Sequence, residues 1–444
     1  MKFKASFAKI ILISIMIIGV LYSQEKKLTL QESIELGLQN SKDLKISQSR
    51  LNNSEAKVSE VNSLFLPQLK FIANYTRLSD NVPPFEVITP FSPNPIRIAE
   101  PVLNNYTLRL SLQQPLFTGL KLISSKKSAE YNFKSAESEY SKEMNEAAYN
   151  IYVAFWNFYK AKEVKDLLTK SLEQIENHLE DTKNFLDNGL VTQNDYLKLQ
   201  VQYSNTKLQL IEAENNLEVA RAVFNKALGF GLGSPTEISE DKLKTENDEY
   251  DLKELINEAK ANRNEIKSLN FRLSADQENI AVSRSGWFPN VYLAGNYYYS
   301  NPNSRFQPPA EEWNDSWDVG ITLSWDIWDW GITSSKTTQA EETSVQTQAT
   351  LEKLNDNIEV EVYQNYLNLT KAKEKVEVSK LSLEQSNENY RITTEKYEVQ
   401  LTTSTDLIDA EISVLQSATN LTTSLIEYKL AKVRLEKSVG RRIY

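Results

Sequence analysis

Three long stretches of this 444-residue chain contain neither glycine nor proline. They lie between Gly119 and Gly189, between Gly189 and Gly229, and between Gly331 and Gly440. Uninterrupted stretches of this kind are typical of long helices, and at 1.5 Å per residue a helix that fills the first of them is about 100 Å long. Helices of this length exceed those of globular domains, so the sequence predicts a coiled coil.

The apolar residues of these stretches recur in alternating steps of three and four. The first series is Ala147, Ile151, Ala154, Phe158, Ala161, Lys165, Leu168, Leu172, Ile175, Leu179, Thr182 and Leu186. The second is Thr192, Tyr196, Leu199, Tyr203, Thr206, Leu210, Ala213, Leu217, Ala220 and Phe224. A period of 3.5 residues indicates helices wound around neighbouring helices. The only histidine, His178, precedes one of these positions, so we expect an exposed or flanking side chain rather than a ligand.

The composition excludes several kinds of catalytic and binding site. The chain has no cysteine and one histidine, which excludes thiol nucleophiles, disulfides, cysteine-based zinc sites and any serine–histidine–aspartate arrangement without His178. The formal net charge of −10 argues against a nucleic-acid partner, which requires a basic face. We therefore expect no cofactor, no metal site and no nucleic-acid partner. An enzyme that uses carboxylates alone remains an alternative.

Residues 1–23 have the pattern of a secretory signal peptide. Three lysines precede an apolar run over residues 10–22, which is too short to span a bilayer. Small residues near its end permit cleavage before Gln24, and an uncleaved anchor is the alternative. No later stretch is apolar over the length that a membrane-spanning helix needs, so we expect the exported chain to enter a membrane, if it does, as a β-barrel.

The two halves of the chain repeat one plan. At one constant offset, the segment 30–34 resembles 252–256 and Pro67 aligns with Pro289. Further along, a slightly smaller offset aligns Asp195 with Asp406. We therefore divide the chain into a signal peptide (1–23), a first structural repeat (24–228), a linker (229–249) and a second structural repeat (250–444).

Each repeat is predicted to contain helix, strand, loop, strand and two long helices. In the first repeat the helices cover 30–66, 119–187 and 191–228, and the strands cover 68–78 and 105–114. In the second repeat the helices cover 250–286, 331–398 and 403–439, and the strands cover 290–300 and 316–326. The longer first half places a proline-rich loop between its two strands.

The four predicted strands alternate apolar and polar residues. The apolar faces are Leu69, Phe71, Ala73 and Tyr75; Tyr106, Leu108, Leu110 and Leu112; Val291, Leu293, Gly295, Tyr297 and Tyr299; and Trp317, Val319, Ile321, Leu323 and Trp325. Alternation over about ten residues is typical of transmembrane β-barrels, although a half-buried soluble sheet is the alternative for any single strand. Aromatic residues gather at the strand ends, with Trp287, Phe288, Trp325, Trp328 and Trp330 at one level and Trp313 and Trp317 towards the other, as in an interfacial girdle.

Four strands are too few to close a barrel, because the smallest bacterial outer-membrane barrels have eight. Open strand edges in lipid would leave backbone groups unpaired at several kcal/mol each, so copies of the chain must share one barrel. Two chains give eight strands and an interior filled by side chains, whereas three give twelve strands and an open lumen. We expect a homotrimer, since the polar faces of the strands suit a water-filled lumen.

The sequence resembles the TolC family of outer-membrane efflux proteins. The resemblance rests on the signal peptide, the repeated halves, and the motifs at 65–67 (FLP), 114–119 (QPLFTG) and 188–195 (NGLVTQND). It implies a mixed α and β membrane protein: a trimeric 12-stranded barrel in the outer membrane, continuous with a 12-helix barrel that crosses the periplasm. The linker 229–249 resembles part of the equatorial region. The expected partners are outer-membrane lipid, a periplasmic adaptor protein and an inner-membrane transporter.

The resemblance also implies site residues at the two turns between long helices. Turn residues expected to dock the adaptor are Gly189, Leu190, Val191, Thr192, Gln400, Leu401 and Thr402. Asp406 and Asp409 match two aspartate rings of the family's closable entrance, which in a trimer supply six carboxylates and favour cations. Tyr397 matches a tyrosine that latches the entrance and Asp195 its acceptor, while Thr402 replaces the expected arginine. Helix capping is the alternative role for the two ring aspartates.

The implied function is a passive exit duct for efflux or type I secretion, without enzymatic activity, that opens by an iris-like movement of its inner helix pair. The alternative is a trimeric coiled-coil adhesin or stalk, which is disfavoured because the strands come as two separated hairpins. The transported substrate is not readable from the sequence.

Overall fold

The computed structural model describes residues 27–239 and 249–444, which form two compact units. The helical unit comprises residues 27–48, 139–239, 249–266 and 354–444, and the sheet unit comprises residues 49–138 and 267–353. Each unit takes segments from both predicted repeats. The predicted signal peptide and residues 240–248 of the predicted linker lie outside the described residues.

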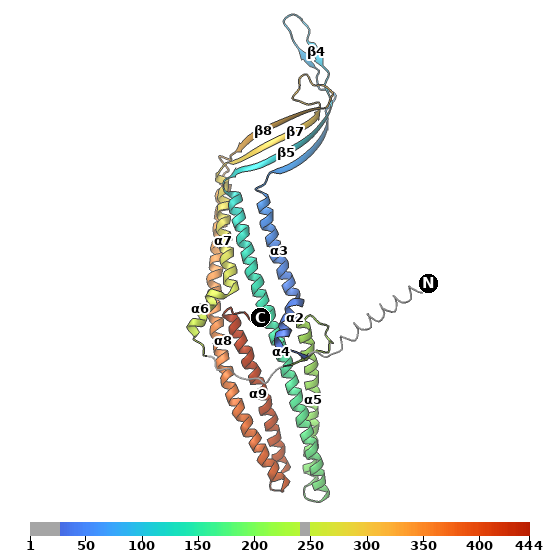
Figure 1. Cartoon of the computed structure of the whole chain (residues 1–444), viewed down its shortest axis with the longest axis vertical. Coiled ribbons are helices and arrows are strands. Elements are labelled where there is room, and N and C mark those ends of the chain that lie inside the picture. Colours follow the sequence, from blue (N-terminus) through green and yellow to red (C-terminus); the bar gives the residue numbers. More distant parts are fainter. Residues whose placement is uncertain (1–26, 240–248) are drawn as a thin grey trace, which may run out of the picture. The chain divides into compact units, whose positions relative to one another are not determined.

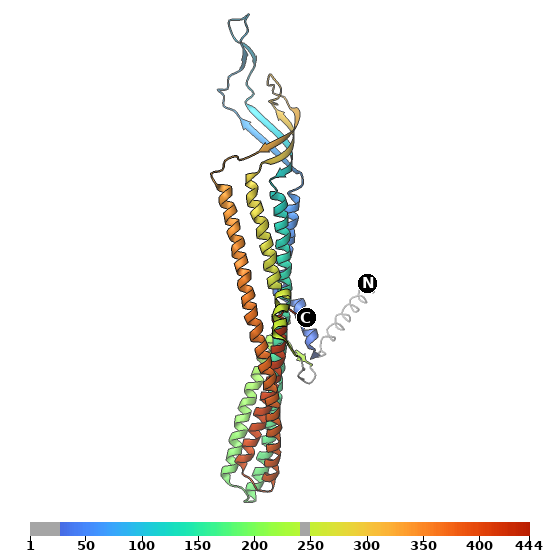
Figure 2. The same ribbon diagram turned by 90° about the vertical axis from the view of Figure 1, so that its left-hand side faces the viewer.

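The helices that the structure describes are α2 (Leu30–Asn40), α3 (Lys42–Ser63), α4 (Lys121–Asp187), α5 (Gln193–Ala227), α6 (Leu252–Asn262), α7 (Asn264–Arg284), α8 (Ile332–Glu398) and α9 (Ser404–Ser438), with a 3-10 turn η1 (Ser285–Trp287) after α7. Figures 1 and 2 show α4 with α5 and α8 with α9 as two helical hairpins. Both α4 and α8 have 67 residues, and both α5 and α9 have 35. The two hairpins therefore match each other helix by helix.

The predicted seams are buried in these helices. On α4 the exposed fractions of Ile151 and Ile175 are 2% and 1%, and on α5 Leu199 and Phe224 are fully buried. On α8 the buried residues recur in the same steps: Leu351, Ile358, Val362, Asn365, Leu369, Ala372 and Val376. The 3.5-residue period therefore marks the packed faces of the helices, as predicted.

Two helices predicted as continuous are interrupted at residues that are neither glycine nor proline. Ser41 separates α2 from α3 with an extended backbone, and its Oγ accepts a hydrogen bond from the backbone N–H of Leu44. Arg263, also extended, separates α6 from α7, and its guanidinium pairs with Glu265. The helix predicted over 250–286 is thus two helices and a 3-10 turn.

The strands that the structure describes are β1 (Lys27–Leu28), β2 (Gln68–Arg77), β3 (Phe85–Val87), β4 (Ile96–Ala99), β5 (Asn104–Thr118), β6 (Glu237–Ile238), β7 (Asn290–Asn301) and β8 (Asn314–Ser324). β2, β5, β7 and β8 form an antiparallel sheet in that order, seen in Figure 1. The proline-rich segment predicted as a loop contains the hairpin β3–β4, and β1 pairs in parallel with β6.

The strand register aligns the predicted apolar faces across the whole sheet. Phe71 pairs with Leu110, and Leu110 pairs with Tyr297. Tyr297 in turn pairs with Trp317. Residues that pair directly across antiparallel strands lie on the same face, so one face of the sheet is apolar on all four strands.

The core of the helical unit forms where α4 and α5 pack together. Phe155, Phe158 and Phe224 are almost completely buried, with ring centroids 5.6 to 5.8 Å apart between Phe224 and the other two. Among the residues that the structure describes, no helix combines the length and the apolar character needed to cross a bilayer.

Candidate functional site

The candidate site lies at the two turns of the helical unit, residues 188–192 between α4 and α5 and residues 399–403 between α8 and α9. Both views place the two turns at the same end of this unit (Figures 1 and 2). α5 and α9 also meet near this end, because Lys198 Nζ donates to Thr405 Oγ1 at 3.0 Å. The turn residues expected to dock a partner are therefore brought together within one chain.

Both turns end their first helix in the same way. The N–H groups of Gly189 and Leu190 donate to the carbonyls of Leu186 and Phe185, each at 2.9 Å. The same pair of bonds recurs at the N–H groups of Gln400 and Leu401, the equivalent residues of the second turn. This pattern is the Schellman motif, which requires a left-handed residue after the helix. Gly189 has φ +74° and Gln400 has φ +63°.

Gln400→Gly is expected to stabilise the tip of the α8–α9 hairpin by about 1 kcal/mol, because a side chain in the left-handed region costs free energy that glycine avoids. Gly189→Ala, at the equivalent position, is expected to destabilise the α4–α5 tip by about the same amount. Hydrogen exchange of the turn amides in the purified chain measures both effects. Changes of the same sign in the two variants would contradict this account.

Both turns also begin their second helix with the same capping box. Thr192 caps α5, and the Asp195 carboxylate accepts bonds from the Thr192 N–H (3.1 Å) and hydroxyl (2.6 Å). Thr403 caps α9, and the Asp406 carboxylate accepts the equivalent bonds at 3.1 and 2.6 Å. The predicted alternative role of Asp406, helix capping, is therefore present in the structure.

The capping bonds set the charge of these two carboxylates. Hydrogen bonds from Thr192 hold the pKa of Asp195 below its ordinary value. Hydrogen bonds from Thr403, and then from Thr402, lower the pKa of Asp406 in the same way. Thr402, which stands where the resemblance implies an arginine, donates its hydroxyl to Asp406 at 2.9 Å. Both aspartates therefore stay ionised through the neutral range.

The predicted ring residues Asp406 and Asp409 are both exposed, and they flank the buried pair Leu407 and Ile408. A spacing of three residues puts the two carboxylates on one face of α9. The capping bonds of this turn engage Asp406 and not Asp409. The two aspartates therefore differ: one is held by the turn, and the other extends from the first turns of the helix.

Tyr397 and Asp195, the predicted latch pair, are not bonded to each other within the described chain. Tyr397 is 4% exposed, and its hydroxyl lies 2.7 Å from Thr182 Oγ1 on α4 and 3.4 Å from Ser404 Oγ on α9. Its ring also packs against Phe185, with centroids 6.0 Å apart. Tyr397 therefore joins α8 to α4 and α9 inside one chain, through a threonine that sequence reasoning did not single out.

A second contact of this kind joins α4 and α8 further from the turns. His178 Nε2 lies 3.0 Å from the Tyr390 hydroxyl. The predicted exposed or flanking histidine is thus partly buried against a tyrosine. Burial lowers the pKa of His178, so the ring is neutral in the physiological range. Among the described residues, no group of three or more His, Asp or Glu side chains could hold a metal ion.

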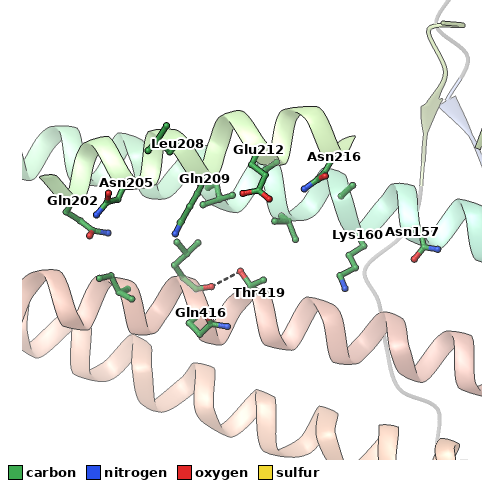
Figure 3. A pocket seen from close by; sticks show the side chains of 16 residues that line it. Asn157, Lys160, Gln202, Asn205, Leu208, Gln209, Glu212, Asn216, Gln416 and Thr419 are labelled. Atoms are coloured by element: carbon green, nitrogen blue, oxygen red, sulfur yellow. Dashed lines mark hydrogen bonds between the residues drawn. The ribbon is translucent and has the colours of Figure 1, made fainter. Parts of the chain in front are cut away.

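A groove of about 750 Å³ lies between α4, α5 and α9, along the helices rather than at the turns (Figure 3). Its walls combine aliphatic residues, amides, one lysine and one glutamate. The lining residues include Lys160, Leu168, Gln209, Glu212, Ile412 and Gln416. The turns predicted to dock a partner are exposed as well, with Leu190 and Leu401 58% and 76% accessible. An exposed apolar residue at each turn and an amphipathic groove are suited to contact with another helical protein.

Comparisons with known proteins agree with this architecture. The chain matches the family described as Outer membrane efflux protein over residues 34–230 and 255–441. It is 24% identical to the outer membrane protein TolC of Vibrio cholerae over 323 residues, covering 70% of this chain and 72% of the relative. The crystal structure of VceC from the same organism aligns with a TM-score of 0.76 at 16% identity, covering 94% and 97% of the two chains. The Campylobacter jejuni CmeC outer membrane channel aligns with a TM-score of 0.77 at 16% identity, covering 93% and 85%.

The likeness to solved structures shows the mixed α and β channel fold, and the family match covers most of the chain. The resemblance read from the sequence motifs is confirmed. The chain therefore belongs to the outer membrane efflux protein family and is a protein of the outer membrane.

Proposed function

We propose that three copies of this chain form a passive exit duct through the outer membrane, and that the duct serves efflux or type I secretion. The observation that carries the proposal is the exposed apolar face of a sheet with two free edges. Phe71, Val319 and Ile321 are 64%, 66% and 69% exposed on that face. β2 and β8 end the described sheet, each with one strand neighbour. A twelve-stranded barrel from three chains pairs these edges and places the apolar face against lipid.

The opposite face of the sheet supports a water-filled lumen. Ser111 donates to Asn296 Oδ1 at 2.7 Å, and Asn296 donates to Asp318 Oδ1 at 2.7 Å. Arg305 completes the row with an ion pair to Asp318 and lies 4.9 Å from the Tyr298 ring centroid. A polar row across three strands suits contact with water rather than with acyl chains.

Aromatic residues at both ends of the sheet support the same placement in a bilayer. At one end Tyr299 stacks on Trp313 with centroids 4.9 Å apart, and Tyr106 lies 5.9 Å from the same indole. At the other end Trp328 and Trp330 are 74% and 87% exposed. Between these levels the strands have 10 to 15 residues, enough to span the apolar part of an outer membrane.

The helical unit is the proposed periplasmic part of the duct. Its two turns form the entrance and dock a periplasmic adaptor, which couples the duct to an inner-membrane transporter. Opening moves α8 and α9 outward, as in an iris. The exposed turn residues and the matching geometry of both turns support a partner that contacts both hairpins. Because the chain has no cysteine, engineered cysteine pairs between neighbouring copies near Asp195 and Tyr397 test the movement; export that continues unchanged with the pairs oxidised argues against it.

Conductance of the purified full chain in planar bilayers tests the duct. The wild-type chain is expected to run as a trimer in detergent and to form cation-selective channels. Asp409→Asn is expected to reduce cation selectivity by removing three carboxylates from the entrance, with little effect on stability.

Asp406→Asn is the matched comparison, since it removes the same charge but also weakens the cap of α9. We expect Asp406→Asn to lower the cation selectivity of the channel and also the thermal stability of the α8–α9 tip. A monomeric chain without channel activity would overturn the proposed function. Unchanged cation selectivity in both variants would overturn only the proposed aspartate rings at the entrance.

A further inference from the structure

Glu411 on α9 is a buried carboxyl group without a partner. Its residue is 4% exposed, and neither carboxylate oxygen has a hydrogen-bond partner among the described residues. It follows Asp406 on the same helix, within the helical unit. Its burial distinguishes it from the exposed aspartates of the entrance. An ionised carboxylate without a partner is strongly disfavoured in such a position, so the group favours its neutral form.

Glu411 belongs to the contact between three helices. When ionised, it lies close enough to Tyr390 of α8 to raise the pKa of that phenol, and the Tyr390 hydroxyl lies 3.0 Å from His178 Nε2 of α4. On the side nearer the turn, Tyr397 joins the same three helices through Thr182 and Ser404. On the other side, Ser382 and Ser386 of α8 lie 3.1 and 2.8 Å from Ser417 of α9. Hydrogen bonds between neutral side chains therefore lie on both sides of Glu411 along the seam, and none of them involves its carboxyl group.

The neighbouring helices provide no positive charge for Glu411 among the described residues. His178 on α4 is held neutral by burial, and its own charged neighbours are Asp181 and Glu398. On α5, Lys198 keeps its charge but donates to Thr405, six residues before Glu411. On α8, Arg391 pairs with Glu388 and Glu395. No charged group contributes to the shifted pKa of Glu411, whose cause is burial. Burial alone raises the pKa of Glu411 from 4.5 to about 7, and burial followed by the charge of Glu411 raises the pKa of Tyr390. An anionic Glu411 would be uncompensated in this packing.

We propose that Glu411 is a proton-operated lock in the α8–α9 hairpin: its neutral form holds α9 against α8 and α4, and loss of the proton loosens the hairpin. The lock is a local property of the helical unit. Its consequence for conductance, an entrance that opens more readily as the periplasm becomes less acidic, rests on the proposed duct.

The direction of the pH dependence follows from the two protonation states. Below pH 4.5, Glu411 carries its proton in both the packed and the loosened hairpin, so it does not bias the packing. Between pH 4.5 and about 7 only the packed hairpin keeps the proton, so rising pH weakens the packing by up to about tenfold per pH unit. Above about pH 7 the carboxyl is ionised in both the packed and the loosened hairpin, so the packing is weakened no further. The hairpin is therefore tightest under acidic conditions.

Hydrogen exchange of the full chain in detergent, corrected for intrinsic exchange rates, tests the lock. Protection of amides in residues 385–415 is expected to fall on the order of tenfold between pH 5.5 and 7.5. Glu411→Gln, which keeps the neutral shape, is expected to remove this pH dependence and to keep protection at least as high as that of the wild type at pH 5.5. The matched control is Glu384→Gln, a substitution on α8, which is expected to behave as the wild type.

Glu411→Met keeps the test interpretable if the amide disturbs folding, because it fills the same space without a polar group. The proposal is overturned if wild-type protection does not vary with pH, or if the glutamine and methionine variants keep the wild-type pH dependence. A pH-dependent hairpin in a chain that forms no channels would leave the lock intact and reject the duct, because the exchange measurement does not involve conduction.

Discussion

Ile321→Lys is expected to reduce incorporation of the chain into lipid vesicles at least tenfold. Ile321 lies on β8, is 69% exposed on the apolar face, and pairs with Leu293 across the sheet. If that face meets lipid, a lysine there costs about 2 kcal/mol or more per chain, and the cost recurs in each copy of a trimer. Flotation of the purified chain with vesicles, followed by quantification of the membrane fraction, measures the effect.

Thr322→Lys provides the matched control on the neighbouring residue. Thr322 pairs with Tyr292 on the polar face of the same strand, so its substitution introduces the same charge into the proposed lumen. We expect near wild-type incorporation and a change in ion selectivity. Equal loss of incorporation in both variants would indicate that lysine disrupts the strand itself. Equal tolerance of both would show that the apolar face does not meet acyl chains.

The faces of the sheet were predictable because alternation fixes which side chains share a side. The order of the strands was not, since alternation says nothing about neighbours. β5 pairs with β7 across two halves of the chain, and this contact joins the two predicted hairpins into one sheet. The hairpin β3–β4 was missed because its prolines indicated a loop, although its strands fall between them. The strand number of the closed barrel and the trimer remain predictions.

The long helices were predictable from the regular spacing of apolar residues, but the interruptions of the shorter helices were not. Ser41 and Arg263 have extended backbones where one helix ends and the next begins, and neither is a glycine or a proline. Ser41 caps the start of α3, and Arg263 pairs with Glu265 of α7. At the candidate site the turns and their capping residues were readable, since threonine three residues before aspartate is a capping signature. The partner of Tyr397 was not, because Thr182 is one of several seam residues that only the packing distinguishes.

Glu411 could have been found from the sequence. It follows Ser404 and Leu407 in steps of three and four, and all three residues are buried. A charged residue at a seam position is costly unless it is paired, and this is the signal that marks it. The seam of α4 contains a comparable exception, Lys165, but its ammonium group lies 3.3 Å from Asp166 and pairs with it. The two positions differ in partner and in burial, since the side chain of Lys165 is 31% exposed and Glu411 is 4% exposed, and the sequence period reveals neither difference.

Phe224→Ala is expected to destabilise the helical unit by about 3–5 kcal/mol. Phe224 is fully buried on α5, and its ring contacts Phe155 and Phe158 of α4 at centroid distances of 5.8 and 5.6 Å. Alanine removes the ring from a contact that joins the two long helices and leaves a cavity which these helices cannot close without shifting. Urea unfolding followed by far-ultraviolet circular dichroism measures the loss, and hydrogen exchange over residues 148–158 places it.

Phe230→Ala is the control, because this ring lies just after α5 and is 37% exposed. Its removal is expected to cost less than half as much, since part of its surface already meets water. Phe224→Leu should fall between the wild type and alanine, because leucine fills part of the cavity. If Phe224→Ala and Phe230→Ala destabilise the chain equally, stability does not depend on the aromatic contact between α4 and α5.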